Sequence, residues 1–292
     1  MVFESRVTWQ KLELELDLLS TEDPHSLLPI LLGLNSLLWP EEPADSLETV
    51  RELNYLSFEL ASQCKDQSEQ QRFEKLNHFF FQNKGFQVLS PCSEGFEEEA
   101  LLPRSILLQR QGAPLPLSLI YLHLASHIDL PINLVQAQPQ CLLKWVRRGK
   151  SHYMDLSQEG RTLSDTDLCQ WLNRYWGNKS PCDKDLEVLP ARRVLYLYLK
   201  DLEQYYESKQ MWNQLHTLFN VLLKLDPHQA QTLCRRALLL KKLGYAKEAL
   251  CDLKQYFSFV EVHQAPAELQ KALYELENMS DESIPPHIDL LH

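Results

Sequence analysis

Residues able to act as nucleophiles, bases or metal ligands are scattered through this sequence of 292 residues. Its seven cysteines show no CxxC spacing, and of its ten histidines only His123 and His127 stand four residues apart. That spacing places two rings on one face of a helix, but no cysteine or pair of carboxylates nearby completes a metal site. The pattern predicts no metal centre, and it indicates reduced thiols, as expected of a cytoplasmic protein.

Motifs that hold nucleotides or metal cofactors do not occur in the sequence. It has no GxGxxG, GxxxxGK[ST], HExxH or EF-hand pattern, and glycine is scarce, at 8 residues. We therefore predict no cofactor. Proline, at 16 residues, is comparatively frequent, which suits helices separated by proline-containing turns.

Charge is distributed unevenly along the chain. Residues 1–100 hold 7 of the 29 basic and 19 of the 40 acidic residues, whereas the remainder is close to neutral. An acidic surface repels phosphate backbones, so nucleic acid is not expected as a partner. No membrane span is expected either, because the apolar run 26–39 is too short and the run 114–135 is interrupted by histidines and an aspartate.

Two clusters of basic residues are candidate binding sites for a protein or peptide partner. The first cluster consists of Lys144, Arg147, Arg148 and Lys150. The second begins with Arg235 and Arg236 and continues to Lys241 and Lys242. The first could bind an acidic peptide or the chain's own acidic residues 1–100; alternatively, it is a solvated turn without a partner.

We expect amphipathic helices to surround the residues that could act as nucleophiles, bases or ligands. Apolar residues at i, i+3 and i+4 predict helices at 27–38, from about 46 and at 68–81, the last closed by Gly85. A further helix at 101–111 is expected to stop at Gly112. The next helix is expected to begin near Pro116, because proline fits the first turn of a helix.

The pattern then changes to short apolar segments at 132–135, 141–146 and 152–156. The second and third flank a polar turn that contains Gly149, which predicts a small antiparallel sheet beside the helices. From Ser164 onward the chain reads as helical again. The fold class predicted from these patterns is α+β and mainly α-helical.

The final hundred residues carry a helical repeat. Five positions of residues 230–256 have the small, turn, small and large apolar residue types of a tetratricopeptide motif: Ala237, Gly244, Ala249, Leu253 and Tyr256. Their equivalents 34 residues earlier are Glu203, Gln210, Leu215, Phe219 and Leu222, which match at the large positions only. Two such units are too few for a free-standing solenoid, so we expect them to pack on the preceding core.

The order of these features resembles one family. Its segments here are Phe80-Phe81-x3-Gly85-Phe86, Arg110 to Tyr121, Ala125 to Pro131, Leu142 to Trp145, Tyr153-Met154-Asp155 and Gly160 to Ser164. Together with the repeat, they resemble the SirB-type regulator family of bacteria, which combines a helical leader, a transglutaminase-like (papain-like) core and tetratricopeptide repeats. The family pattern Arg-x-Gly-x-Pro-x-Ser-Leu is fairly specific in combination, although each piece of it alone is weak.

The resemblance implies where a catalytic triad would stand. An active transglutaminase-like core has a cysteine at the start of a buried helix, a histidine on the first strand of the sheet and an aspartate on the next strand. This sequence has Pro116 at the first position and Gln140 at the second, and only Asp155 matches the third. Glutamine cannot take a proton near neutral pH, so the resemblance implies the fold but argues against the chemistry.

Three neighbouring residues could replace the lost groups. Ser118 is expected in the first turn of its helix, Cys141 on the opposite strand face from Gln140, and His152 on the opposite face from Asp155. We read each as structural, and Asp155 as an acceptor for the backbone or for Gln140. The sequence thus predicts a non-catalytic regulatory or scaffolding module that binds a protein or peptide; the alternative is a hydrolase or acyltransferase that uses Ser118 or Cys141 near Asp155. We expect a helical region at 1–90, the core at 91–190 and repeat helices at 191–292.

Overall fold

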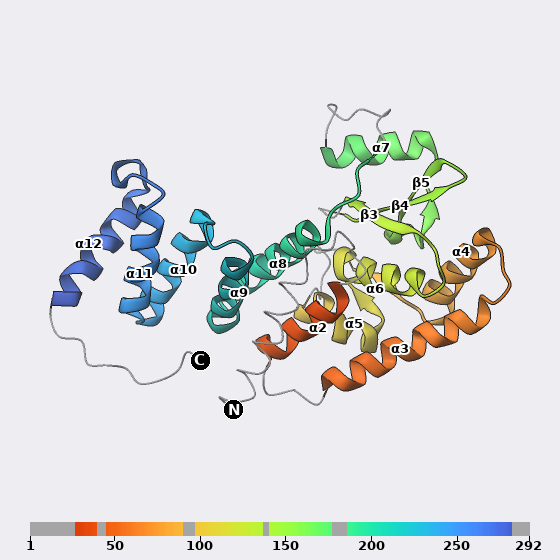
Figure 1. Ribbon diagram of the computed structural model, residues 1–292, viewed down its shortest axis with the longest axis horizontal. Helices are drawn as coiled ribbons and strands as arrows, with labels where there is room; N and C mark the ends of the chain where they lie inside the picture. Colours follow the sequence, from red (N-terminus) through yellow and green to blue (C-terminus); the bar gives the residue numbers. More distant parts are fainter. Residues whose placement is uncertain (1–26, 40–44, 90–96, 137–139, 177–185, 282–292) are drawn as a thin grey trace. The chain divides into compact units, whose positions relative to one another are not determined.

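Figure 1 shows a computed structural model that describes residues 27–39, 45–89, 97–136, 140–176 and 186–281. The described residues form two compact units, one ending at Asp201 and one beginning at Leu202. The first unit combines helices with a four-stranded antiparallel sheet, and the second is helical. The predicted mainly α-helical α+β class is confirmed.

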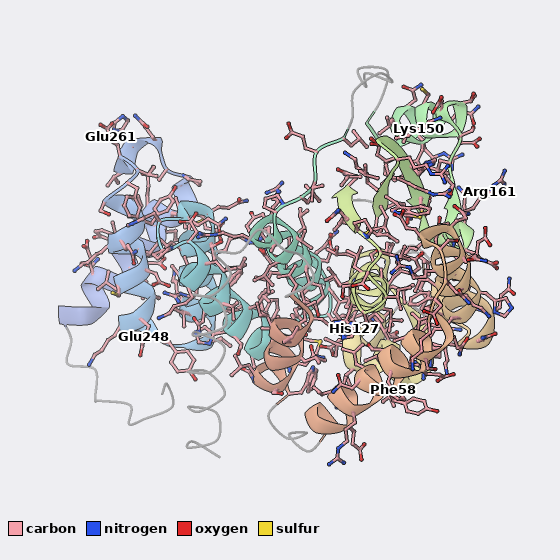
Figure 2. The ribbon with its side chains drawn as sticks, turned by 45° about the vertical axis from the view of Figure 1, so that its right-hand side comes forward. Phe58, His127, Lys150, Arg161, Glu248 and Glu261 are labelled. Atoms are coloured by element: carbon pink, nitrogen blue, oxygen red, sulfur yellow. The ribbon has the colours of Figure 1, made fainter. Side chains whose placement is uncertain are left out.

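Three helices come first among the described residues of the first unit. They are α2 (Leu27–Leu38), α3 (Asp45–Gln63) and α4 (Glu69–Asn77), which a π-helical turn (His78–Asn83) extends. Ser68 caps α4 through a reciprocal pair of hydrogen bonds with Gln71. Leu53, Leu56 and Leu60 of α3 are buried as their spacing predicts. Phe58 projects from the outer face of the same helix and is 77% exposed (Figure 2).

Helix α5 (Pro103–Gln109) is shorter than the sequence predicted. It ends at Arg110, whose φ of 61° is left-handed, so Gly112 does not terminate it. Instead, β1 (Gln87–Val88) and β2 (Gln111–Gly112) form a short parallel ladder. Gly112 is needed for packing, because a Cβ atom there would lie 2.5 Å from Cδ1 of Ile106.

Helix α6 (Pro114–Ser126) is the centre of the first unit. Its residues from Pro114 to Leu122 are all buried, as expected of a helix that is apolar all round. It contacts α2, α3, α4, α5 and β3. The helix starts two residues before the predicted Pro116, because Ala113 is extended and Pro114 takes the first helical position.

The four-stranded sheet has the order β3-β4-β5-β6. Its strands are β3 (Ile132–Gln136), β4 (Leu142–Arg147), β5 (Lys150–Asp155) and β6 (Arg161–Thr162), all antiparallel to their neighbours. Arg148 and Gly149 join β4 to β5 with φ values of 51° and 74°, as a two-residue hairpin turn of type I′ requires. The predicted hairpin is therefore confirmed, and β6 is an additional edge strand.

Helix α7 (Asp165–Trp176) packs on the sheet through Leu168, Trp171 and Leu172, whereas α6 lies on the other side of the sheet (Figure 1). Cys169 on α7 is disulfide-bonded, and its partner lies outside the described residues. The expectation of reduced thiols throughout is therefore wrong at this position. Two thiols pair only when the fold brings their Cα atoms within about 7 Å, which sequence spacing does not reveal. Cysteine usage thus gives no support to a reducing compartment.

Helical pairs make up the second unit. Helix α8 (Ala191–Ser208) begins in the first unit and ends in the second. It is followed by α9 (Trp212–Leu225), α10 (Ala230–Leu243), α11 (Ala246–Phe257) and α12 (Ala267–Asp281), with a short 3-10 turn at Val262–Gln264. Ala237, Ala249, Leu253 and Tyr256 share one buried cluster, as the motif spacing predicts. Gln210 (φ 59°) and Gly244 (φ 87°), 34 residues apart, both turn the chain in the left-handed conformation.

Helices α2 and α3 contact α5 and α6 within the first unit. The division into regions 1–90, 91–190 and 191–292 stays a prediction.

Among the described residues, no helix combines the length and apolar character that crossing a bilayer demands.

Candidate functional site

Asp155 ends β5, and both oxygens of its buried carboxylate accept hydrogen bonds. Oδ1 accepts hydrogen bonds from the backbone N–H of Ser157 at 2.8 Å and from its hydroxyl at 2.6 Å. Oδ2 accepts a hydrogen bond from the indole Nε1 of Trp171 at 2.9 Å. Asp155 thereby caps the 3-10 turn Leu156–Gln158 and ties the sheet to α7. These hydrogen bonds give the carboxylate a structural role.

Ser118 and Cys141 form a second buried pair, on the α6 side of the sheet. Ser118 lies in the second turn of α6, and its hydroxyl donates to the carbonyl oxygen of Pro114 at 2.7 Å. It also hydrogen-bonds with Cys141, which directly precedes β4 and is 2% exposed. Burial raises the pKa of the Cys141 thiol well above its usual range, and the bond to Ser118 offsets this only in part. A protonated thiol is a poor nucleophile.

The sheet separates Asp155 from this pair. Leu142 stands opposite Asp155 in the β4–β5 ladder and packs with Trp171 on the α7 side. Because successive residues of a strand point to opposite faces, Cys141 points toward α6. Among the described residues, the groups that shift the pKa of Cys141 are Ser118, Asp201 and Asp155, and none is an imidazole.

Pro116 and Gln140, at the positions implied for nucleophile and base, do not meet Asp155. Pro116 is buried in the first turn of α6. The side-chain Oε1 of Gln140 is buried and has no hydrogen-bond partner among the described residues. The three hydrogen bonds that Asp155 accepts come from Ser157 and Trp171, so none of them joins it to Gln140 as predicted. His152 pairs with Trp145 across the ladder, their rings 5.9 Å apart, and it occupies the strand face opposite to Asp155.

The hairpin residues Lys144, Arg147, Arg148 and Lys150 do not form one surface cluster. Lys144 is buried, and its ammonium donates to the carbonyl oxygen of Leu186 at 3.0 Å. Arg147 donates to the side chain of Gln70 at 2.6 Å and lies over the ring of Trp145. Of the four, only Arg148 and Lys150 are exposed. Figure 2 shows Lys150 at the hairpin. The alternation along β4 turned Lys144 inward.

The second predicted basic cluster divides between a structural pair and a groove. Arg236 binds both oxygens of the buried Asp252, at 2.7 and 2.6 Å, and Oδ1 of Asn220 at 2.8 Å. It therefore joins α9, α10 and α11 and has little capacity for a ligand. Arg235 points elsewhere, pairing with Glu203 and Glu207.

Arg235 lines a groove of about 620 Å³ within the second unit. The apolar lining comprises Trp212, Leu215, Phe219, Leu238 and Leu239. The charged lining comprises Glu207, Arg235, Lys241, Lys242, Glu268, Lys271 and Glu275. The walls belong to α8, α9, α10 and α12, so four helices contribute to one surface. We call it the repeat groove.

Sequence reasoning missed two tryptophans that matter here. Trp171 anchors Asp155, and the i, i+3, i+4 series Leu168, Trp171 and Leu172 was the signal that placed it on the inner face of α7. Trp212 begins α9 and lines the repeat groove, with the ammonium of Lys242 3.6 Å from its ring centroid. The signal for Trp212 was its position 34 residues before Ala246, the first residue of α11.

No group of three or more histidine, cysteine or acidic side chains that could hold a metal ion occurs in the described ranges.

Comparison with known proteins relates the first unit to one family. Residues 48–200 match the transglutaminase-like superfamily. A UPF0162 protein of Xylella fastidiosa strain Temecula1 is 25% identical over 221 residues, which cover 73% of this chain and 75% of the relative.

Two further relatives extend this similarity. A UPF0162 protein of Buchnera aphidicola is 26% identical over 78% of this chain and 84% of its own length. Protein SirB1 of Salmonella typhimurium is 27% identical over 207 residues, 69% of this chain and 74% of the relative. No solved structure matches the chain.

Proposed function

The chain belongs to the transglutaminase-like superfamily, in its SirB type, and we propose that it works without catalysis, as a regulatory or scaffolding module that binds a protein or peptide. The observation that carries this proposal is the repeat groove, where an apolar floor lies beside several cations. A groove of this composition offers both the apolar burial and the charged contacts on which peptide recognition depends.

The buried Asp155–Trp171 and Ser118–Cys141 contacts support the non-catalytic part of the proposal. Each group with catalytic potential satisfies a structural partner, and each is withdrawn from solvent. A substrate carbonyl would need a path to Ser118 or Cys141, and both are at most 2% exposed. We therefore assign the first unit the role of a rigid support.

Helices α8 to α12 support the binding part of the proposal. We interpret them as tetratricopeptide-type repeats, because the turns at Gln210 and Gly244 and the buried positions Ala237, Ala249 and Leu253 recur at the expected spacing. Stacked helix pairs of this type present concave surfaces to extended partners. In this proposal the chain acts in the cytoplasm.

Photo-crosslinking in the native cell tests the binding proposal. The full chain would carry p-benzoylphenylalanine in place of Leu238, which lines the repeat groove, or in place of Phe259, which is exposed outside it. We expect a discrete adduct with one partner from position 238 and none from position 259. Equal adduct patterns at the two positions, or no adduct at position 238, would contradict the proposal.

The alternative is a hydrolase or acyltransferase that uses Ser118 or Cys141 near Asp155. The direct contact between Ser118 and Cys141 is the observation in its favour. It predicts that an electrophilic probe labels one of these residues in the native protein, and that Ser118→Ala or Cys141→Ala abolishes a measurable activity.

Thiol labelling separates the two functions. Cys251 is exposed, whereas Cys141 is buried with a raised pKa. We expect iodoacetamide to modify Cys251 rapidly and Cys141 only after denaturation, as read by peptide mass spectrometry. If native Cys141 reacted as fast as Cys251, the non-catalytic assignment would fail.

A further inference from the structure

One end of the repeat groove has more positive than negative charge. Lys241 and Lys271 share a single carboxylate, Glu275, with Lys271 3.7 Å from it. The hydrogen bond from Lys241, aided by the charge of Lys271, lowers the pKa of the Glu275 carboxyl. Lys242, beside them, makes no ion pair with any described residue and lies over Trp212. Lys241, Lys242 and Lys271 thus outnumber Glu268 and Glu275, the two glutamates of α12 that line the groove.

The opposite end of the groove is different. Arg235 contacts both Glu203 and Glu207, so its charge is already compensated. Leu215, Phe219 and Leu239 form an apolar floor in the groove, and these three side chains are buried. A segment that fits must therefore bring leucine-sized apolar side chains to the floor and carboxylates to the lysine end.

The chain itself contains such a segment. Residues 12–19 read Leu-Glu-Leu-Glu-Leu-Asp-Leu-Leu, so every carboxylate has an apolar neighbour on both sides. Glu13, Glu15 and Asp17 carry three negative charges without a basic residue among them. These eight residues lie outside the described ranges, and their composition complements the charges of the groove.

We propose that the repeat groove binds an acidic, leucine-rich segment, and that residues 12–19 of the same chain occupy it when no partner is bound. This inference rests on the proposed function, because it specifies which kind of partner binds the same groove and how that binding is regulated. A partner with similar alternation of leucine and acid would then compete with the chain's own segment. An internal competitor acts at an effective concentration in the millimolar range, so it weakens binding without any further contact.

A peptide-binding experiment with the full chain tests the inference. The probe is a fluorescein-labelled peptide of residues 9–21, and its affinity is read by fluorescence anisotropy. The intact chain is compared with the variant Glu13→Lys, Glu15→Lys, Asp17→Lys, in which the internal segment no longer fits. We expect the variant to bind the peptide about tenfold or more tightly than the intact chain, since the internal competitor is gone.

The lysine end provides the matched test of location. Adding Lys242→Glu and Lys271→Glu to that variant should weaken peptide binding about tenfold or more, whereas Arg148→Glu and Lys150→Glu on the hairpin should leave it unchanged. Circular dichroism checks that every variant is folded. Equal affinity of the intact and triple-variant chains would overturn the inference, and so would an unaltered affinity in the Lys242 and Lys271 variant.

Two outcomes distinguish other occupants. If light scattering shows a dimer for the intact chain and a monomer for the triple variant, the segment binds a second copy, and the same-chain proposal is wrong. If the peptide does not bind but the crosslink from position 238 persists, the groove binds a partner that is not acidic and leucine-rich. In that case this inference fails while the proposed function stands.

Discussion

Asp155, at the position that the family resemblance implied for an orienting aspartate, is part of the scaffold in this structure. Its two oxygens accept three hydrogen bonds, from two groups of Ser157 and from Trp171. Catalytic groups commonly cost stability, because their environment is arranged for chemistry. A carboxylate that joins β5 to α7 has the opposite effect, which gives a direct way to distinguish the two roles.

Asp155→Ala should lower the free energy of unfolding by about 2–4 kcal/mol, because it leaves the buried indole N–H of Trp171 without an acceptor and removes the cap of the turn at Ser157. Asp155→Asn should cost about half as much, since its amide oxygen can still accept a hydrogen bond, whereas its NH₂ group cannot. Urea unfolding followed by tryptophan fluorescence measures both. The exposed neighbour Gln158→Ala is the control, expected within about 0.5 kcal/mol of the original chain. If Asp155→Ala were as stable as that control, the structural role would be refuted.

His216 gives the second unit a dependence on pH. Its partial burial lowers the pKa of the imidazole below its usual 6.5, and Arg236 lowers it further, while Asp252 and Glu248 act against both. The unfolded chain therefore binds a proton more readily than the native one below pH 6.5, so stability falls as the pH decreases through that value. Thermal denaturation of the second unit at pH 7.5 and 5.5 should show this loss. His216→Gln should reduce the difference between the two pH values; an unaltered difference would exclude His216 as its source.

At the scale of elements, the two helical pairs turn at equivalent positions with unequal residues. Gly244 adopts φ 87° without strain, whereas Gln210 adopts φ 59° with a side chain that disfavours this region. No atom lies within 4 Å of the position that a Cβ on Gly244 would take, so backbone conformation alone decides the effect of a substitution there.

Gly244→Ala should destabilise α10 and α11 by about 1–2 kcal/mol, because alanine pays the left-handed penalty. Gln210→Gly should have the opposite sign and stabilise α8 and α9 by up to about 1 kcal/mol. Hydrogen exchange of the helix amides measures each effect locally. If the two substitutions changed the stability of their helices in the same direction, the two turns would not be equivalent.

Element types were accessible from the sequence, but several boundaries were not. Apolar spacing predicted α2, α3, α4 and the β4–β5 hairpin, whose Arg148-Gly149 turn has a strong local signature. The start of α6 was misplaced by two residues, because both Pro114 and Pro116 suit a first turn. The role of Gly112 was misread, since its close approach to Ile106 depends on tertiary packing.

At the scale of the whole molecule, the family and the fold class could be predicted because several short motifs follow one another in the family's order, and the family match covers residues 48–200. The repeat groove could not, since its lining comes from four helices separated by up to about seventy residues. The disulfide of Cys169 was hidden for the same reason. Local patterns determine elements, whereas surfaces and covalent cross-links depend on how the elements come together.

The central claim is that the chain acts by binding through the repeat groove and not by catalysis. In the cell that encodes it, the gene would be deleted and replaced by one of two variants, and the proteome of each strain compared with the original. Ser118→Ala with Cys141→Ala removes each candidate nucleophile, and Trp212→Ala with Lys242→Glu alters the groove. We predict that the first variant restores the original proteome and the second does not. Restoration by the groove variant, together with failure of the nucleophile variant at equal protein level, would contradict the account.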